Sequence, residues 1–113
     1  MTVTITQLFP ATQLTNAAAT IYTAPTTPTT TTVARVRVRF ANTDSASHAV
    51  TAYAIQTGGT ASAANCCCNA ETIAANAHLD LDMPQLGPAG FYQAFADVAS
   101  KVTITCLDGI IFS

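Results

Sequence analysis

Four cysteines are the residues in this 113-residue chain whose types most directly suggest chemistry. Three of them are consecutive, Cys66-Cys67-Cys68, and the fourth, Cys106, lies far along the chain. Thiolates are good zinc ligands, but zinc sites usually take two ligands from a C-x2-C pair because both must reach one ion from one turn. The run of three lacks that spacing, so its chemistry is not fixed by the sequence.

Three interpretations of the cysteines stay open. One is a metal site that combines the run with Cys106, His48 or His78, and another is a disulfide from Cys106 to one member of the run. The third, which we favour, is that they are small buried apolar residues or free thiols in a protein made in a reducing cytosol. In a strand, the first and third cysteines of the run share one face and the second takes the other.

Charged residues form two stripes at strand spacing. Arg35, Arg37 and Arg39 alternate with apolar residues in RVRVRF, and Asp80 and Asp82 alternate with Leu in HLDLDM. Because strand side chains alternate between faces, each set lies on one face of its strand. We expect these five residues to form either a solvated face or electrostatic pairs, within the subunit or across a subunit contact.

The sequence contains no residues or motifs that indicate an active site. His48 and His78 fall on different predicted strands, and each is expected to be a surface or hydrogen-bonded strand residue. The chain has no G-x-S-x-G signature, and Gly58-Gly59 lacks both the pattern and the following helix of a phosphate loop. We therefore predict no catalytic, cofactor-binding or metal-binding residues and a non-enzymatic protein.

The sequence predicts that β-strands position the cysteines and the charged residues. Alternation of apolar and polar residues predicts strands at residues 2–6, 35–40, 48–55, 78–82, 91–96, 101–106 and 110–112. Turn residues separate them about every 8–14 residues, and Asp108-Gly109 predicts a tight turn before the last strand. The expected fold is all-β: a single antiparallel β-sandwich, Ig-like or jelly-roll-like, of about seven to nine short strands.

The whole chain, residues 1–113, is expected to form a single domain. Several segments outside the predicted strands carry weaker signals. Residues 16–20 could form one helical turn, and residues 61–65 a short helix or a loop. Two Pro and seven Thr in residues 23–32 favour a Thr/Pro-rich extended loop or arm. Residues 1–10 are expected to form an N-terminal arm that reaches a neighbour.

Composition excludes several classes of protein. Charged residues make up 9% of the chain, and the net charge is −2 with only four basic side chains, so we expect no nucleic-acid partner. No window approaches the 18 apolar residues of a membrane span, and no signal peptide is visible, so we expect no membrane partner. A surface with so little charge suits a subunit that packs against other subunits.

Short motifs recur in an order that resembles a known group. They run from about residue 7 to residue 112: LFPATQL, IYTAP, FANTD, VTAYAIQTGGTASAAN, TIAANAHLDLDM and FYQAFADVASKVTITCLDGI. This order resembles the small β-sandwich structural proteins of tailed bacteriophages and prophages. The cysteine run and the triple Arg are not part of that pattern.

The resemblance implies a virion structural protein made in the host bacterial cytoplasm. Its expected function is capsid decoration or cementing, in which it binds the outside of the head. We expect it to contact the major capsid protein or other virion proteins. We also expect it to form a homo-oligomer, with a trimer favoured. We expect the subunit or capsid contacts at Arg35, Arg37, Arg39, Asp80 and Asp82. The alternatives are a tail or head-fibre accessory protein, a receptor- or glycan-binding module, and a metal or thiol protein that uses the cysteine cluster.

Overall fold

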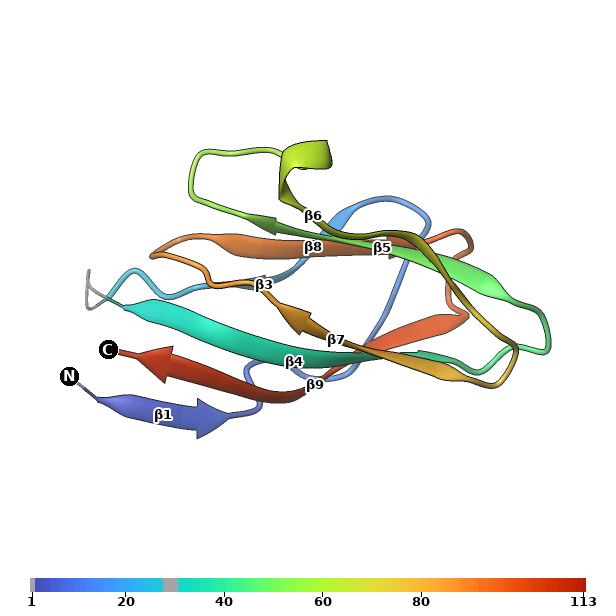
Figure 1. Cartoon of the computed structure of the whole chain (residues 1–113), viewed down its shortest axis with the longest axis horizontal. Coiled ribbons are helices and arrows are strands. Elements are labelled where there is room, and N and C mark those ends of the chain that lie inside the picture. The colour runs from blue at the N-terminus through green and yellow to red at the C-terminus, as the bar shows by residue number, and fades with distance from the viewer. Residues whose placement is uncertain (1, 28–30) are drawn as a thin grey trace.

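A computed structural model describes residues 2–27 and 31–113 of the chain (Figure 1). Met1, which belongs to the expected N-terminal arm, and residues 28–30 of the Thr/Pro-rich segment lie outside the described residues. No helix among the described residues has both the length and the apolar character needed to cross a membrane.

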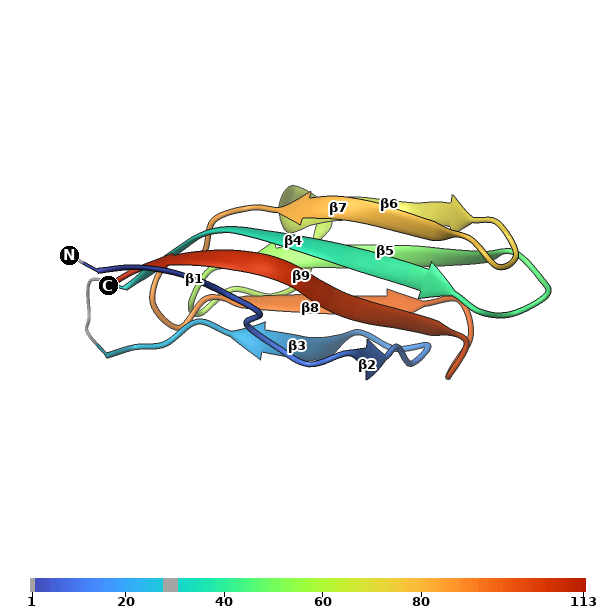
Figure 2. The same cartoon turned by 90° about the horizontal axis from the view of Figure 1, so that it is seen from below.

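Two antiparallel sheets pack face to face, which confirms the predicted β-sandwich (Figure 2). The first sheet, in the order β1-β9-β4-β7 with β2 also paired to β9, consists of β1 (Val3–Thr6), β9 (Val102–Phe112), β4 (Thr32–Asn42), β7 (His78–Met83) and β2 (Thr12–Gln13). The second sheet, in the order β3-β8-β5-β6, consists of β3 (Ala19–Thr23), β8 (Phe91–Ala96), β5 (His48–Ile55) and β6 (Cys66–Ile73).

The order in which the strands pair decides between the two expected kinds of β-sandwich, Ig-like and jelly-roll-like. Strands β5 and β6 pair, and outside them β4 pairs with β7, β3 with β8, and β1 and β2 with β9. The chain is therefore one long hairpin that rolls up until β4 meets β9 in one sheet and β5 meets β8 in the other. This rolled hairpin is the jelly-roll topology.

Alternating side chains from both sheets fill the space between them. In β4 the apolar residues Val36, Val38 and Phe40 are fully buried, while the arginines between them face outward. In β8, Tyr92 is buried, and its hydroxyl donates a hydrogen bond to the Pro84 carbonyl oxygen. One apolar cluster joins these residues to the rest of the interior, and this burial supplies most of the driving force for folding.

Several strands lie where the alternation was weak. Strands β2, β3 and β6 were not among those predicted, and residues 16 and 17 form a bend before β3 rather than the helical turn considered for residues 16–20. Pairing with β8 overrides the helix propensity of this alanine-rich stretch. The short helix considered for residues 61–65 is confirmed as a 3-10 turn, η1 (Ala63–Asn65).

The predicted tight turn at Asp108-Gly109 is wrong. Strand β9 continues through both residues, and its register with β4 shifts by one residue at Leu107. The extra residue is a β-bulge, which bends the strand without ending it. Gly109 is needed for packing: a Cβ built there would lie 2.6 Å from Cδ1 and Cγ of Leu8.

We predict that Gly109→Ala destabilises the fold by about 1–3 kcal/mol, the usual cost of overpacking. The matched control is Gly87→Ala, whose new Cβ would meet only Gln56 Oε1 at an ordinary 3.4 Å. Chemical denaturation of both variants measures the difference in unfolding free energy. Leu8→Ala in the Gly109→Ala background should restore part of the loss, because it removes the clashing atoms. An additive double mutant would contradict this explanation.

Candidate interaction surface

The expected stripes of charge meet as cross-strand pairs on the outer face of the β1-β9-β4-β7 sheet. The register of β4 with β7 places Arg37 opposite Asp82 and Arg39 opposite Asp80. Arg39 makes two parallel bonds to Asp80, Nε to Oδ1 at 2.8 Å and Nη2 to Oδ2 at 3.1 Å. Arg37 makes one, Nε to Asp82 Oδ1 at 3.2 Å. The pairing expected from the sequence therefore occurs within the subunit.

The Arg39–Asp80 pair stabilises the charged forms of both its members. Hydrogen bonding to Asp80, followed by its charge, raises the pKa of Arg39. Hydrogen bonding to Arg39 lowers the pKa of Asp80. The side chains of both pairs stay about half exposed, so solvent screens them and they add little to stability. They present a fixed, alternating pattern of charge that a partner can contact.

Arg35 differs from the other two arginines. It is exposed and lies opposite Ile110 of β9, and it takes part in none of the ion pairs that the described residues form. Its guanidinium is therefore available to a partner carboxylate. Whether these five charged residues contact another subunit or a capsid stays a prediction.

Exposed apolar residues on β1 and β9 lie in the same sheet as the charged pairs and were not singled out from the sequence. Val3, Ile5 and Leu107 are 54%, 69% and 38% exposed and are the exposed large hydrophobic residues of the described chain. Val3 pairs with Phe112 and Ile5 with Ile110, so these four side chains share one face of the sheet. The alternation of Thr2 to Thr6 indicated a strand, but only the pairing with β9 shows which face its apolar residues occupy.

A second charged cluster lies at one end of the sandwich. His48, at the start of β5, bonds through Nε2 to Asp44 Oδ2 at 2.7 Å and through Nδ1 to Asp97 Oδ1 at 2.9 Å. Because carboxylates accept hydrogen bonds, both ring nitrogens must carry protons to satisfy both partners. Hydrogen bonding to Asp44 raises the pKa of His48 and in turn lowers the pKa of Asp44.

The cluster ties together turns that are distant in sequence. Asp44 belongs to the β4–β5 connection and Asp97 to the β8–β9 connection. Buried Asn42 holds Asp44 in place, because its Oδ1 accepts from the Asp44 backbone N–H at 3.0 Å. Its Nδ2 donates to the backbone carbonyls of Ala46 and Ile73. The expectation of a hydrogen-bonded strand histidine is thus confirmed for His48, and the other histidine, His78, is exposed on β7.

The four cysteines are distributed between the two sheets. Cys106 is buried in β9, and its sulfur accepts a hydrogen bond from the Leu8 backbone N–H. The run of three begins β6, is half-buried, and contains no disulfide. Within the described ranges, no group of three or more His, Cys, Asp or Glu residues is placed to hold a metal ion.

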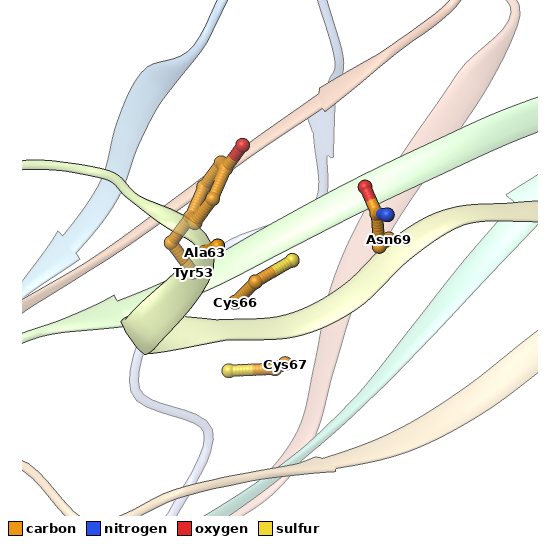
Figure 3. Close-up of a pocket in the computed structure, with 5 residues that line it drawn as sticks. All are labelled: Tyr53, Ala63, Cys66, Cys67 and Asn69. Atoms are coloured by element: carbon orange, nitrogen blue, oxygen red, sulfur yellow. The ribbon is translucent and has the colours of Figure 1, made fainter.

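Strict alternation fails within the cysteine run. Cys66 and Cys67 project to opposite sides of β6 (Figure 3). Cys68, expected to share a face with Cys66, packs against the core together with Cys67. The register of β5 with β6 shifts at this point, which explains the change. Burial raises the pKa of Cys67 to about 11, so its thiol is protonated at neutral pH.

A hollow of about 480 Å³ lies beside β5, β6 and η1 (Figure 3). It is lined by Tyr53, Ala63, Cys66, Cys67 and Asn69. Tyr53 stacks on Phe95 of β8, with ring centroids 6.4 Å apart.

Part of the aromatic surface of the chain reaches solvent. The chain has eight aromatic residues. Only Phe9, Phe40 and Tyr92 are buried, and the other five are half-buried.

Comparison with known proteins identifies a fold but no family. No family model matches the chain, and no curated protein matches it. It is similar to a chain in the structure of infectious bursal disease virus, Gx strain, with a TM-score of 0.51 and 10% identity. For the Gt strain the TM-score is 0.50 and the identity 8%. Each match covers 97% of this chain and 31% or 32% of the other, so the chain spans about a third of those proteins.

The shared feature is the fold. At 8% and 10% identity these matches carry no site residues to this chain. The resemblance to tailed-phage proteins, seen in the short motifs, stays a prediction.

We predict that the stability contributed by His48 depends on pH. Because folding raises its pKa from the ordinary 6.5, this contribution is fully present below about pH 6.5 and is lost as the pH rises through the raised value. Thermal denaturation between about pH 5 and pH 9 should show the largest difference between wild type and His48→Gln at the acid end of that range. His78→Gln, which leaves the cluster intact, should follow the wild type. A difference that does not change with pH would contradict a charged His48.

Proposed function

We propose that this chain is a structural protein of a virus particle, and more specifically a decoration protein that binds the outside of a tailed-phage head and stabilises it. The observation that carries the proposal is the jelly-roll topology shared with chains from structures of a virus. Jelly rolls occur in viral capsid domains, as they do in lectins and cupins, and this favours the proposal.

The surface supports the same proposal. Two Arg–Asp pairs and the exposed Arg35 form a charge pattern on one sheet, and the exposed Val3 and Ile5 lie in the same sheet, across β9 from Arg35. A rim of charge next to apolar residues is the usual composition of a protein–protein contact. Binding to the assembled shell, and not to free capsid subunits, stabilises the shell by mass action. The trimer expected from the sequence resemblance belongs to this proposal.

The first test is whether the chain is part of a particle. Particles from a culture that carries the gene are banded on a density gradient and probed with an antibody against the chain. We expect the chain to band with the particles and the antibody to label their outer surface. A chain found only in the soluble fractions would contradict the proposal.

The second test uses the register of β4 with β7. A variant with Arg37→Asp, Asp82→Arg, Arg39→Asp and Asp80→Arg keeps both ion pairs and the net charge but exchanges their positions. We expect an unchanged melting temperature and at least about tenfold weaker binding to particles from a strain that lacks the gene, measured by co-sedimentation. Arg35→Glu should weaken the same binding. Unchanged binding by both variants would show that the five residues form only a solvated face.

A glycan-binding role is the second candidate, favoured by the hollow beside Tyr53. The hollow combines a half-exposed aromatic ring with the polar Asn69, and sugars bind to such combinations through stacking and hydrogen bonds. A glycan array should then give signals with the purified chain that Tyr53→Ala removes. Thr105→Ala, on the outer face of the opposite sheet, is the control. An array without signal would leave this candidate unsupported.

A further inference from the structure

The free edge of β1 offers a defined set of hydrogen-bonding groups. Thr2 and Ser113 exchange both backbone hydrogen bonds, N to O at 2.6 and 2.8 Å. In an antiparallel ladder such pairs alternate with pairs whose backbone groups point away from the partner strand. Thr4 and Thr6 therefore also bond to β9, whereas Val3 and Ile5 direct their N–H and C=O groups away from it. Among the described residues, β9 is the only strand paired with β1.

The other sheet edges carry features that oppose pairing with another chain. Strand β7 has Asp80 and Asp82, β6 contains two register shifts and Glu71, and β3 contains a register shift. Charges and bulges are the usual protection of an exposed edge. Strand β1 has neither: its register with β9 is regular, and the chain contains no charged side chain before Arg35. Figure 1 shows β1 at the rim of the molecule, outside β9.

The edge is complementary to itself. If two copies of β1 pair antiparallel about a two-fold axis at Thr4, Val3 of each copy lies opposite Ile5 of the other. The groups that Val3 and Ile5 direct outward then form four cross-strand hydrogen bonds, and each Thr4 keeps its bonds to β9. In such an isologous contact both copies use the same surface. The contact satisfies the free backbone N–H and C=O groups of Val3 and Ile5 in both copies.

The same register joins the apolar residues of the two copies. Val3, Ile5, Ile110 and Phe112 lie on one face of each sheet. Pairing at β1 brings the two sets of four together beside the axis, so the exposed Val3 and Ile5 bury part of their surface against each other. A partner strand with a charged side chain at either position would lose this contact. The edge therefore fits a second copy of this chain better than a strand of unrelated sequence.

We infer that β1 is a self-association edge, through which two copies of this chain join their β1-β9-β4-β7 sheets into one continuous sheet. The contact is small, because β1 has four residues, and it lies below the roughly 1,000 Å² that a stable interface needs. It is therefore a weak contact that repetition within an assembly strengthens. The inference rests on the proposed particle role only for that repetition, since pairing itself is tested on the purified chain.

Cysteine cross-linking tests the register. In the proposed pairing, Thr4 faces Thr4 of the second copy at about 4.5 Å between Cα atoms, close enough for a disulfide. Under mild oxidation Thr4→Cys should give a covalent dimer. Thr6→Cys should not, because its opposite residue is Thr2, and the wild type controls for the four native thiols. Equal cross-linking of Thr4→Cys and Thr6→Cys would overturn the register.

Sedimentation velocity tests the association itself. As the concentration of the wild type is raised, we expect the mass to double, from the 11.7 kDa monomer to a dimer or from the proposed trimer to a six-copy species. Ile5→Lys should abolish this doubling, and Leu107→Lys, an equal change at an exposed apolar residue away from the edge, should not. A wild type whose mass does not double, or a doubling that Ile5→Lys leaves unaffected, would overturn the inference. Co-banding with particles is a separate result, so each proposal can fail alone.

Discussion

The antiparallel pairing of β4 with β9 is the constraint on which the rest of the structure depends. These are the two longest strands, 11 residues each, and they pair from Thr32 with Phe112 to Asn42 with Val102. Because β4 uses its other edge for β7 and β9 uses its other edge for β1, this one ladder places the Arg–Asp pairs at the β7 edge of the sheet and the apolar β1 at the opposite edge. A protected edge and an open edge thus belong to the same sheet.

Local alternation was enough to predict the fold class and most of the strands. The pattern in RVRVRF and HLDLDM exposes one face and buries the other, and β4 and β7 follow it. It failed at Asp108-Gly109, where a turn dipeptide lies inside a continuous strand because β4 supplies a partner on both sides of the bulge. It also missed β3 and β6, whose residues gain strand structure only from pairing with β8 and β5.

The sequence predicted which charged residues make up the candidate surface, but not how they are arranged. The spacing of Arg37, Arg39, Asp80 and Asp82 fixed which residues share a face, whereas their pairing within one subunit depends on the register of β4 with β7. The cluster of His48 with Asp44 and Asp97 could not be predicted, since it joins the β4–β5 and β8–β9 connections and its members His48 and Asp97 are 49 residues apart. The open edge of β1 is likewise a property of the pairing with β9 and not of its sequence alone.

Electron cryo-microscopy of gradient-purified particles tests the central claim most directly, because it places individual copies of the chain. The account predicts jelly-roll density on the outer surface of the particle, with the Arg–Asp face toward its neighbours and the β1 strands of adjacent copies paired across two-fold axes. Particles whose outer surface lacks this density, in a preparation where the chain is present, would contradict it.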